Sequence, residues 1–168
     1  MATLTTHDHD GEIAVFLIGA RINRLWRPDA WGPAFAAMGP MLAELYRDPD
    51  SGFLGARTLL GLRGPTVVQY WRSVEDIYAY AGDDARRHRP AWVDFYRRAK
   101  RVPGAVGVWH ETFRVAAGGH ESLYVDVPGA LGLAAATGVV PAHRRGRTAR
   151  ERLRSASPRT PRPTPPPR

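Results

Sequence analysis

The feature that most constrains the fold is an apolar segment near the N-terminus, Glu12–Asn23, which reads EIAVFLIGARIN. It is rich in β-branched and aromatic residues and turns polar at its end, which predicts a buried strand that reaches the surface there. Side chains alternate between the two faces of a strand. Both alternating sets are apolar here: Ala14, Phe16 and Ile18 on one face, and Ile13, Val15 and Leu17 on the other. The sheet that contains this strand therefore needs cover on both sides.

The rest of the chain supplies partners for this strand. A helix is expected over Asp29–Tyr46, with Gly39-Pro40 kinking or splitting it. Two strands are expected next, Phe53–Leu62 and Thr66–Arg72, joined by a hairpin turn at Arg63-Gly64-Pro65. A helical region then starts with the capping sequence Ser73–Asp76 and reaches Arg101, with a break near Gly82. The last expected elements are a strand over Ala105–Val115 and an extra strand over Ser122–Val127.

This order, β-α-β-β-α-β plus one strand, predicts the α+β class: a ferredoxin-like split βαβ fold with an antiparallel sheet. Helices cover one face of such a sheet. A second copy of the same sheet covers the other face most simply, so we expect a homodimer in the form of a dimeric α+β barrel.

The net charge of +8 is located in the C-terminal segment. Residues 141–168 hold nine arginines, one acid and seven of the 15 prolines, whereas residues 1–140 are neutral. A DNA-binding domain should carry its basic stripe on folded elements, so no specific nucleic-acid partner is expected. We expect a flexible N-terminus (1–11), one domain (12–140) and a disordered Arg/Pro-rich tail (141–168), with a short helix over Arg147–Arg154 as an option and the tail dispensable.

The chain has no cysteine, which excludes disulfides, thiolate metal sites and cysteine nucleophiles. No apolar run approaches the length of a bilayer span, and the N-terminus is unlike a signal peptide, so we expect no membrane insertion and a cytoplasmic protein. No dinucleotide-binding, Walker or nucleophile-elbow motif is present. The segment His7–Asp10 lies too close to the chain end to indicate a metal site.

Two polar side chains close the first strand. Arg21 and Asn23 share the face of Leu17, where they could hold a carbonyl, carboxylate or oxyanion at the mouth of a pocket. The alternative is that they leave the core and are hydrated. On Tyr70-Trp71-Arg72, at the end of another strand, the tryptophan either packs in the core or lines a site.

Histidines and aromatic residues mark two further places. Trp109-His110-Glu111 places Trp109 and Glu111 on one strand face and His110 on the other, so that the polar face is either solvated or lines a polar cavity. His88 and Trp92 lie four residues apart, with Pro90 between them. His88 is either a capping or surface histidine, or a general base or haem axial ligand.

Taken together, these segments resemble the antibiotic-biosynthesis-type monooxygenases, in particular their uncharacterised bacterial members and the fumagillin-pathway monooxygenase-like proteins. The resemblance covers roughly residues 12–140 and rests on five segments: Ile18–Asn23 with Trp26, Pro49–Gly52, Gln69–Arg72, His88–Trp92 and Gly107–Thr112.

The resemblance implies a dimeric α+β barrel with a pocket between sheet and helices, a small hydrophobic or electron-rich organic substrate, and a place in secondary metabolism. Some members use neither metal nor flavin, because the substrate carbanion reduces oxygen directly. It implies catalytic roles for His88, Asn23, Arg21, Trp71 and His110, with the histidines moving a proton. It implies substrate contacts for Trp26, Tyr70, Arg72, Trp92, Trp109 and Glu111.

The same superfamily includes haem-degrading monooxygenases and aldoxime dehydratases. Asn23, Trp71 and His88 match the order of the Asn, Trp and axial His of the haem degraders, but the spacing from Trp71 to His88 is longer and Pro90 interrupts the helix. Three hypotheses follow: a cofactor-independent monooxygenase; a haem enzyme with His88 or His110 as the iron ligand and no other metal; and a non-catalytic ligand-binding dimer. The third gains if Arg21, Asn23 and His88 lie outside any pocket.

Overall fold

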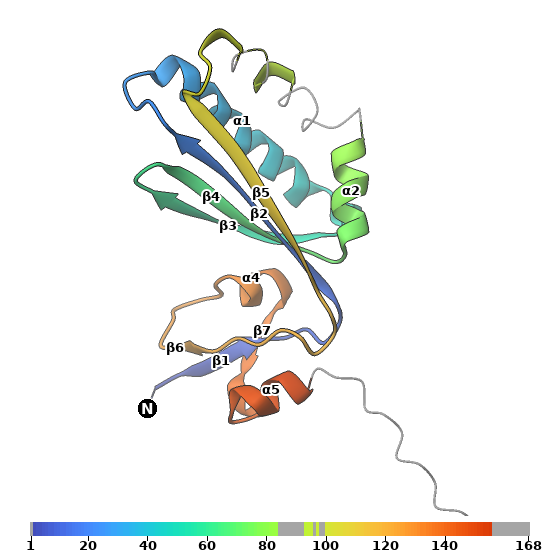
Figure 1. Cartoon of the computed structure of the whole chain (residues 1–168). Helices are drawn as coiled ribbons and strands as arrows, with labels where there is room; N and C mark the ends of the chain where they lie inside the picture. Colours follow the sequence, from blue (N-terminus) through green and yellow to red (C-terminus); the bar gives the residue numbers. More distant parts are fainter. Residues whose placement is uncertain (1, 84–92, 96, 98–99, 156–168) are drawn as a thin grey trace, which may run out of the picture.

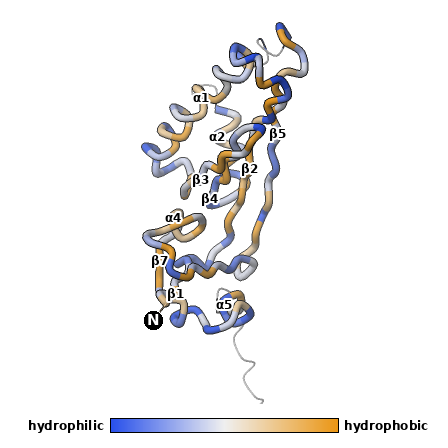
Figure 2. Tube along the Cα trace, turned by 90° about the vertical axis from the view of Figure 1, so that its left-hand side faces the viewer, coloured by the Kyte–Doolittle hydropathy of each residue, from blue (hydrophilic) through white to orange (hydrophobic). Residues whose placement is uncertain are grey.

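The computed structural model describes residues 2–83, 93–95, 97 and 100–155 (Figure 1). Its larger sheet is antiparallel and has the strand order β3-β4-β2-β5. The bounds are β2 Ile13–Ile22, β3 Phe53–Gly61, β4 Gly64–Trp71 and β5 Val106–Val115. This is the expected ferredoxin-like order, with the first strand of the motif, β2, in the centre between β4 and β5. Figure 2 shows β2 as largely hydrophobic, as its position requires.

Two helices cover one face of this sheet (Figure 1). Helix α1 spans Pro28–Arg47 and runs unbroken through Gly39-Pro40, so the expected split does not occur. Helix α2 spans Val74–Gly82, and the Ser73 hydroxyl accepts the Asp76 N–H at its start, as the capping sequence predicted. We call the face beneath these helices the helix face.

The core lies between the helices and the helix face. Its buried cluster joins two sheet residues to three helix residues: Ala14, Trp71, Leu45, Val74 and Ile77. The hairpin between β3 and β4 is tight because Gly64 has φ of 132° and lies against the Ala20 carbonyl; a Cβ at Gly64 would come within 2.2 Å of that oxygen.

The opposite face of the sheet, which we call the open face, is only partly covered by the chain. In antiparallel pairs, residues in register share a face. Gly19, Leu17 and Val15 of β2 pair with Trp109, Glu111 and Phe113 of β5, which places all six on the open face. Phe113 is 50% exposed and Trp109 36% exposed. The single chain thus leaves this face without the cover that its apolar residues require.

A second lobe lies at the end of the larger sheet (Figure 1). It is built on a three-stranded sheet of order β6-β1-β7. Its elements are β1 Leu4–His7, β6 Tyr124–Val125, α4 Leu133–Thr137, β7 Val139–Pro141, η2 Ala142–Arg144 and α5 Ala149–Ser155. Helix α4 packs against β3, where Gly55 lies close to Ala136.

The second lobe corrects the expected domain division. Residues 4–7 were assigned to a flexible terminus and residues 141–155 to a disordered tail, yet both are folded here. They pair with each other, since Thr5 and Thr6 lie opposite Pro141 and Val140. Residues 156–168 lie outside the described residues. The strand expected over Ser122–Val127 is present as β6, but it belongs to the small sheet.

Within the described ranges, no helix combines the length and hydrophobicity that crossing a membrane requires.

Candidate functional site

A large apolar cavity lies between α1 and the helix face. Its volume is about 600 Å³, within the usual range of sites for small organic ligands. Its walls come from one side of α1, from the sheet and from the β3–β4 hairpin, and they include Trp31, Phe35, Met38, Leu42, Ile18, Ala20, Thr58, Pro65, Val67 and Val108. We call it the helix-side cavity.

The sequence produces this cavity by combining large residues on the helix with small ones opposite. Trp31, Phe35, Met38 and Leu42 recur at intervals of three or four residues and so form one stripe of α1. Glycine and alanine positions contribute to the wall they face: Gly19, Ala20, Gly61 and Gly64. Since small side chains cannot fill the space beneath α1, a hollow remains.

A small niche adjoins the helix-side cavity. Its volume is about 50 Å³, and it shares Ile18, Met38 and Leu42 with the larger space. Polar groups enter its wall, which is otherwise apolar, through Gln69, Trp71 and Tyr80. No charged side chain lines either space among the described residues. The described lining therefore offers no counter-charge to a buried ionic group.

Gln69 and Trp71 form a fixed pair in the niche. The Trp71 indole N–H donates to Gln69 Oε1 at 2.9 Å, and the two residues are 1% and 7% exposed, respectively. Trp71 also stacks edge-on against Phe53, with ring centroids 5.3 Å apart. The pair is thus held rigidly by the core.

His110 lies beside the niche rather than in its wall. It stands on the helix face of β5, opposite Ile18, with its ring centroid 5.6 Å from that of Phe16, which lines the niche. His110 is exposed to solvent. It is the described histidine best placed to exchange a proton between the niche and solvent.

Most of the other residues expected at the site lie elsewhere. Arg21 pairs with Gly107 on the open face and is exposed. Tyr70 also faces away from the helices, since it pairs with Val15. Burial raises the pKa of Tyr70, whose hydroxyl lies near Gly132 of the second lobe. Neither residue reaches the helix-side cavity.

Trp109 and Glu111 are on the open face and His110 is on the helix face, as alternation predicted. The Trp109 indole lies flat over Gly19, where a Cβ would come within 2.5 Å of its ring. Trp109 is therefore a packing residue in this chain. Glu111 is exposed opposite Leu17.

Two more candidates have structural partners outside the cavity, and a third is exposed. The Asn23 side-chain amide donates to the Gly104 carbonyl at 3.1 Å and so ties the start of β5 to the end of β2. Arg72 forms an ion pair with Asp76, 3.3 Å apart. Trp26 is 75% exposed. His88 and Trp92 lie outside the described residues, so their roles stay predictions from the sequence.

Gln69, which lines the niche, was not among the site residues expected from the sequence. The available signal was a polar residue on the same strand face as Trp71, inside an otherwise apolar strand. The stripe of α1 was also not expected to form a cavity wall. Helical periodicity indicates a buried helix face, but it does not show whether the space beneath that face is filled.

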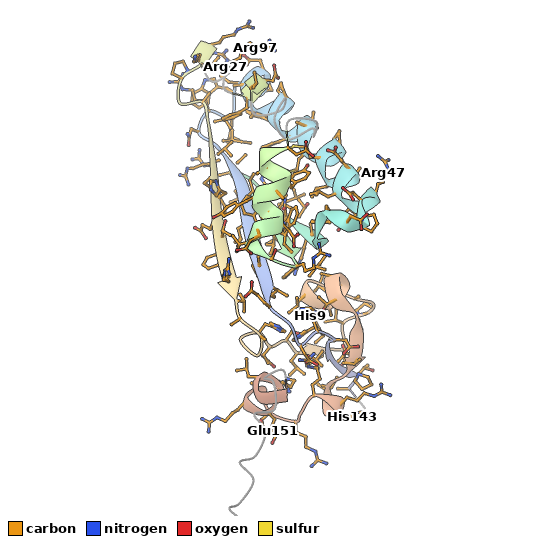
Figure 3. All side chains as sticks on the ribbon, turned by 90° about the vertical axis from the view of Figure 1, so that its right-hand side faces the viewer. His9, Arg27, Arg47, Arg97, His143 and Glu151 are labelled. Atoms are coloured by element: carbon orange, nitrogen blue, oxygen red, sulfur yellow. The ribbon has the colours of Figure 1, made fainter. Side chains whose placement is uncertain are left out.

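The second lobe contains a different kind of buried site, a chain of hydrogen bonds through two histidines. Ser122 Oγ lies 2.8 Å from His7 Nδ1, and His7 Nε2 lies 2.8 Å from His120 Nδ1. His120 Nε2 lies 2.8 Å from the Gly11 carbonyl oxygen. His9 lies next to this chain at the junction of the two lobes, with its ring centroid 5.7 Å from that of His120 (Figure 3).

The Gly11 carbonyl at the end of the chain determines which nitrogen of each histidine donates when both rings are uncharged. A carbonyl oxygen only accepts, so His120 donates from Nε2 and, when neutral, accepts at Nδ1. His7 must then donate from Nε2 and accept the Ser122 hydroxyl proton at Nδ1. Burial, together with the Arg145 charge, lowers the pKa of His7 to about 4, so that the neutral form of His7 is favoured.

Arg145 connects the segment that contains this hydrogen-bond chain to the C-terminal part of the protein. It is 7% exposed and donates to the His7 and His9 carbonyls at 3.3 and 2.8 Å, while its other nitrogen pairs with Asp10 at 2.6 Å. A polar hollow of about 260 Å³ lies beside it, between Arg144, Val140 and the side chains of Asp8 and Asp10. No group of three or more His, Asp or Glu side chains in the described residues is arranged to hold a metal ion.

The fold and its cavity define the class of protein: a ferredoxin-like α+β domain with an apolar cavity between sheet and helices. A family model for "Monooxygenase af470-like" proteins matches residues 13–133, and the chain belongs to that family. Monooxygenase af470 from Aspergillus fumigatus is 27% identical over 124 residues, which cover 69% of this chain but 43% of that protein. The chain thus spans less than half the length of this curated relative.

Among solved structures, an aldoxime dehydratase in complex with butyraldoxime is similar to 83% of this chain and 38% of its own, with a TM-score of 0.55 and 15% identity. A putative antibiotic biosynthesis monooxygenase from Caulobacter crescentus covers 60% of this chain and 88% of its own, with a TM-score of 0.42 and 13% identity. SnoaB, a cofactor-independent oxygenase from Streptomyces nogalater, covers 61% and 91%, with a TM-score of 0.37 and 15% identity.

Proposed function

We propose that this protein is a monooxygenase that oxidises a small, mostly apolar organic molecule held in the helix-side cavity. The observation that carries the proposal is the cavity itself: about 600 Å³ of apolar space in a member of a monooxygenase family. The cavity is open on one side, and it exposes a contiguous set of apolar side chains, which is typical of a binding site. A ligand that fills the cavity accounts for its retention.

In the form we propose, the reaction uses neither metal nor flavin. A C–H bond of the substrate is broken, its proton goes to a base, and the resulting carbanion passes electrons to dioxygen. One oxygen atom enters the substrate and the other leaves as water, so that a CH₂ group becomes a carbonyl. The protein contributes position, exclusion of water and hydrogen bonds to the developing negative charge.

His110 is the described residue that we propose as the base. An imidazole ring can accept a proton, and this side chain stands beside Phe16 at the border between niche and solvent. Trp71 shapes the niche and holds Gln69 in place. The roles inferred from the sequence for Arg21, Asn23 and Arg72 in orienting substrate find no support in their positions.

We propose further that the protein is a homodimer joined through the open face. The half-exposed apolar side chains of that face, among them Phe113 and Trp109, need cover that a second copy would give. The substitution Leu17→Asp, in the middle of the face, should convert a dimer to a monomer in light scattering coupled to gel filtration. A monomeric wild-type protein would contradict this assignment.

One observation favours a second candidate, a ligand-binding domain without catalysis: Arg21 and Asn23 both lie outside the cavity. A haem enzyme is less well supported, because the described lining of the cavity offers no histidine to hold iron. A hemin titration followed by absorbance at 300–700 nm distinguishes the haem hypothesis from the other two candidate functions. It should give no specific Soret shift if the proposal holds.

The test of the proposed function is oxygen uptake with aromatic ketones and hydroquinones under labelled dioxygen. The expected result is substrate-dependent uptake, with one labelled atom in the product and one in water. His110→Asn should slow the reaction without loss of folding. Ligand binding with no oxygen uptake across the panel would favour the non-catalytic candidate.

A further inference from the structure

Gln69 is the buried polar side chain whose hydrogen bonding is incomplete in the niche. It stands on the helix face of β4, in register with Phe16 on one side and Ala56 on the other. With 7% of its surface exposed, its amide is surrounded by apolar groups. A polar group in such a place needs partners, because burial without them is costly.

The neighbouring tryptophan determines which way the amide points. An indole N–H can only donate, so the amide must turn its oxygen to Trp71, and the contact of 2.9 Å joins these two atoms. The NH₂ group then points away from Trp71, and Gln69 is one of the residues that line the niche. Within the described part of the chain the NH₂ group has no protein acceptor, and it is not sealed from the cavity.

We propose that the Gln69 NH₂ group binds an oxygen atom of the substrate, and that the substrate is therefore an uncharged ketone or a related compound with one acceptor oxygen on an apolar body. The apolar body occupies the helix-side cavity and the oxygen enters the niche, whose volume of about 50 Å³ admits one small group. This inference rests on the proposed function, since it names the substrate class of that same cavity.

The same contact would assist the chemistry. When a C–H bond next to a carbonyl breaks, the proton goes to the base and the electron pair shifts onto the carbonyl oxygen, which becomes an enolate. The oxygen gains negative charge in this step, so an N–H donor already in place stabilises the transition state more than the bound ketone. Trp71 acts through Gln69 as a positioning residue, since it prevents the amide from turning over.

The test uses two probes of nearly the same shape, 1-tetralone and tetralin, in which a carbonyl replaces a CH₂ group. Calorimetry of the full chain should show 1-tetralone binding about fivefold more tightly than tetralin, the value of one ordinary hydrogen bond. In Gln69→Met, which keeps the length of the side chain, the preference should fall to about one. Thr66→Val, on the same strand but facing the open side, is the matched control and should keep the wild-type preference.

The outcomes separate this inference from the proposed function. Equal binding of both probes to the wild-type protein overturns the inference and leaves the cavity as a ligand site; it would mean that water satisfies Gln69. A preference that survives in Gln69→Met overturns it as well. Failure of both probes to bind the wild-type protein contradicts the cavity as a ligand site, so the proposed function and the inference fall together. The wild-type comparison needs no variant, so it stands even if Gln69→Met does not fold.

Discussion

The interiors of the two lobes differ in polarity and in hydrogen bonding. The helix-side cavity is apolar space in which the Gln69 amide keeps a donor for something not supplied by the described chain. The second lobe buries histidines and an arginine, and its Ser122–His7–His120 chain ends on a backbone carbonyl. Arg145 donates to two backbone carbonyls and to Asp10, while its buried Nε has no acceptor among the described residues. An interior with spare apolar volume is suited to a ligand. An interior crossed by a continuous chain of hydrogen bonds is suited to fixing one arrangement of the chain.

The largest effect should come from breaking the polar interior. Arg145→Met leaves the His7 and His9 carbonyls without their donor and should lower the free energy of unfolding by about 4 kcal/mol. Chemical denaturation measures the change. Arg144→Met, one position away and exposed, is the control and should change the free energy by less than about 0.5 kcal/mol. Equal effects of the two variants would show that the Arg145 contacts contribute no stability.

Acid should weaken the second lobe through His7. Its pKa is about 4 in the folded protein and 6.5 in the unfolded chain, so between these values the unfolded state binds the extra proton. Stability is therefore full above pH 6.5 and is lost as the pH falls toward 4, by about 3 kcal/mol from this group. The measurement is the free energy of unfolding against pH for wild type and His7→Asn. The wild-type curve should fall more steeply, and parallel curves would contradict the assignment.

Filling the apolar interior should affect ligand binding rather than folding. Ala20→Phe puts a ring into the helix-side cavity and should weaken binding of 1-tetralone at least about tenfold, with little loss of stability because the space is empty. Calorimetry and thermal melting measure the two quantities. Ala116→Phe, at an exposed position outside the cavity, is the control. Unchanged binding in Ala20→Phe would place the ligand elsewhere.

The smallest effect should come from Asn23. Its side chain makes an exposed hydrogen bond to Gly104, so Asn23→Ala should lower the free energy of unfolding by about 1 kcal/mol. Turnover should be unaffected at saturating substrate, since the side chain does not reach the cavity. A stable Asn23→Ala protein without activity would restore the catalytic role inferred from the sequence.

The larger sheet was predictable from the sequence because its signals are local. Alternation located the four strands and assigned Trp109, His110 and Glu111 to the correct faces, and Ser73 marked the start of α2. In the second lobe, local signals indicated only the strand at β6 and, as an option, the short helix at α5. The contacts of this lobe join residues 113 to 138 positions apart, such as His7 with His120 and with Arg145, and a short polar strand looks like a flexible terminus.

The site was predicted only in part, for a related reason. Alternation separates the two faces of a strand but does not say which face adjoins the pocket. The structure places Arg21, Tyr70 and Glu111 on the open face and Trp71 and His110 on the helix face, so the five cannot all line the helix-side cavity. Gln69 was missed because its importance depends on the orientation of its amide, which only the contact with Trp71 reveals.

The most direct test of the central claim is oxygen uptake by wild type, Ala20→Phe and Arg21→Ala on one substrate that the wild-type protein oxidises. Ala20 and Arg21 are adjacent in β2 and point to opposite faces of the sheet. Comparing the two variants therefore shows on which face the reaction takes place. The account predicts that Ala20→Phe loses the activity and Arg21→Ala retains it. Activity retained in Ala20→Phe and lost in Arg21→Ala would contradict the account and move the site to the open face.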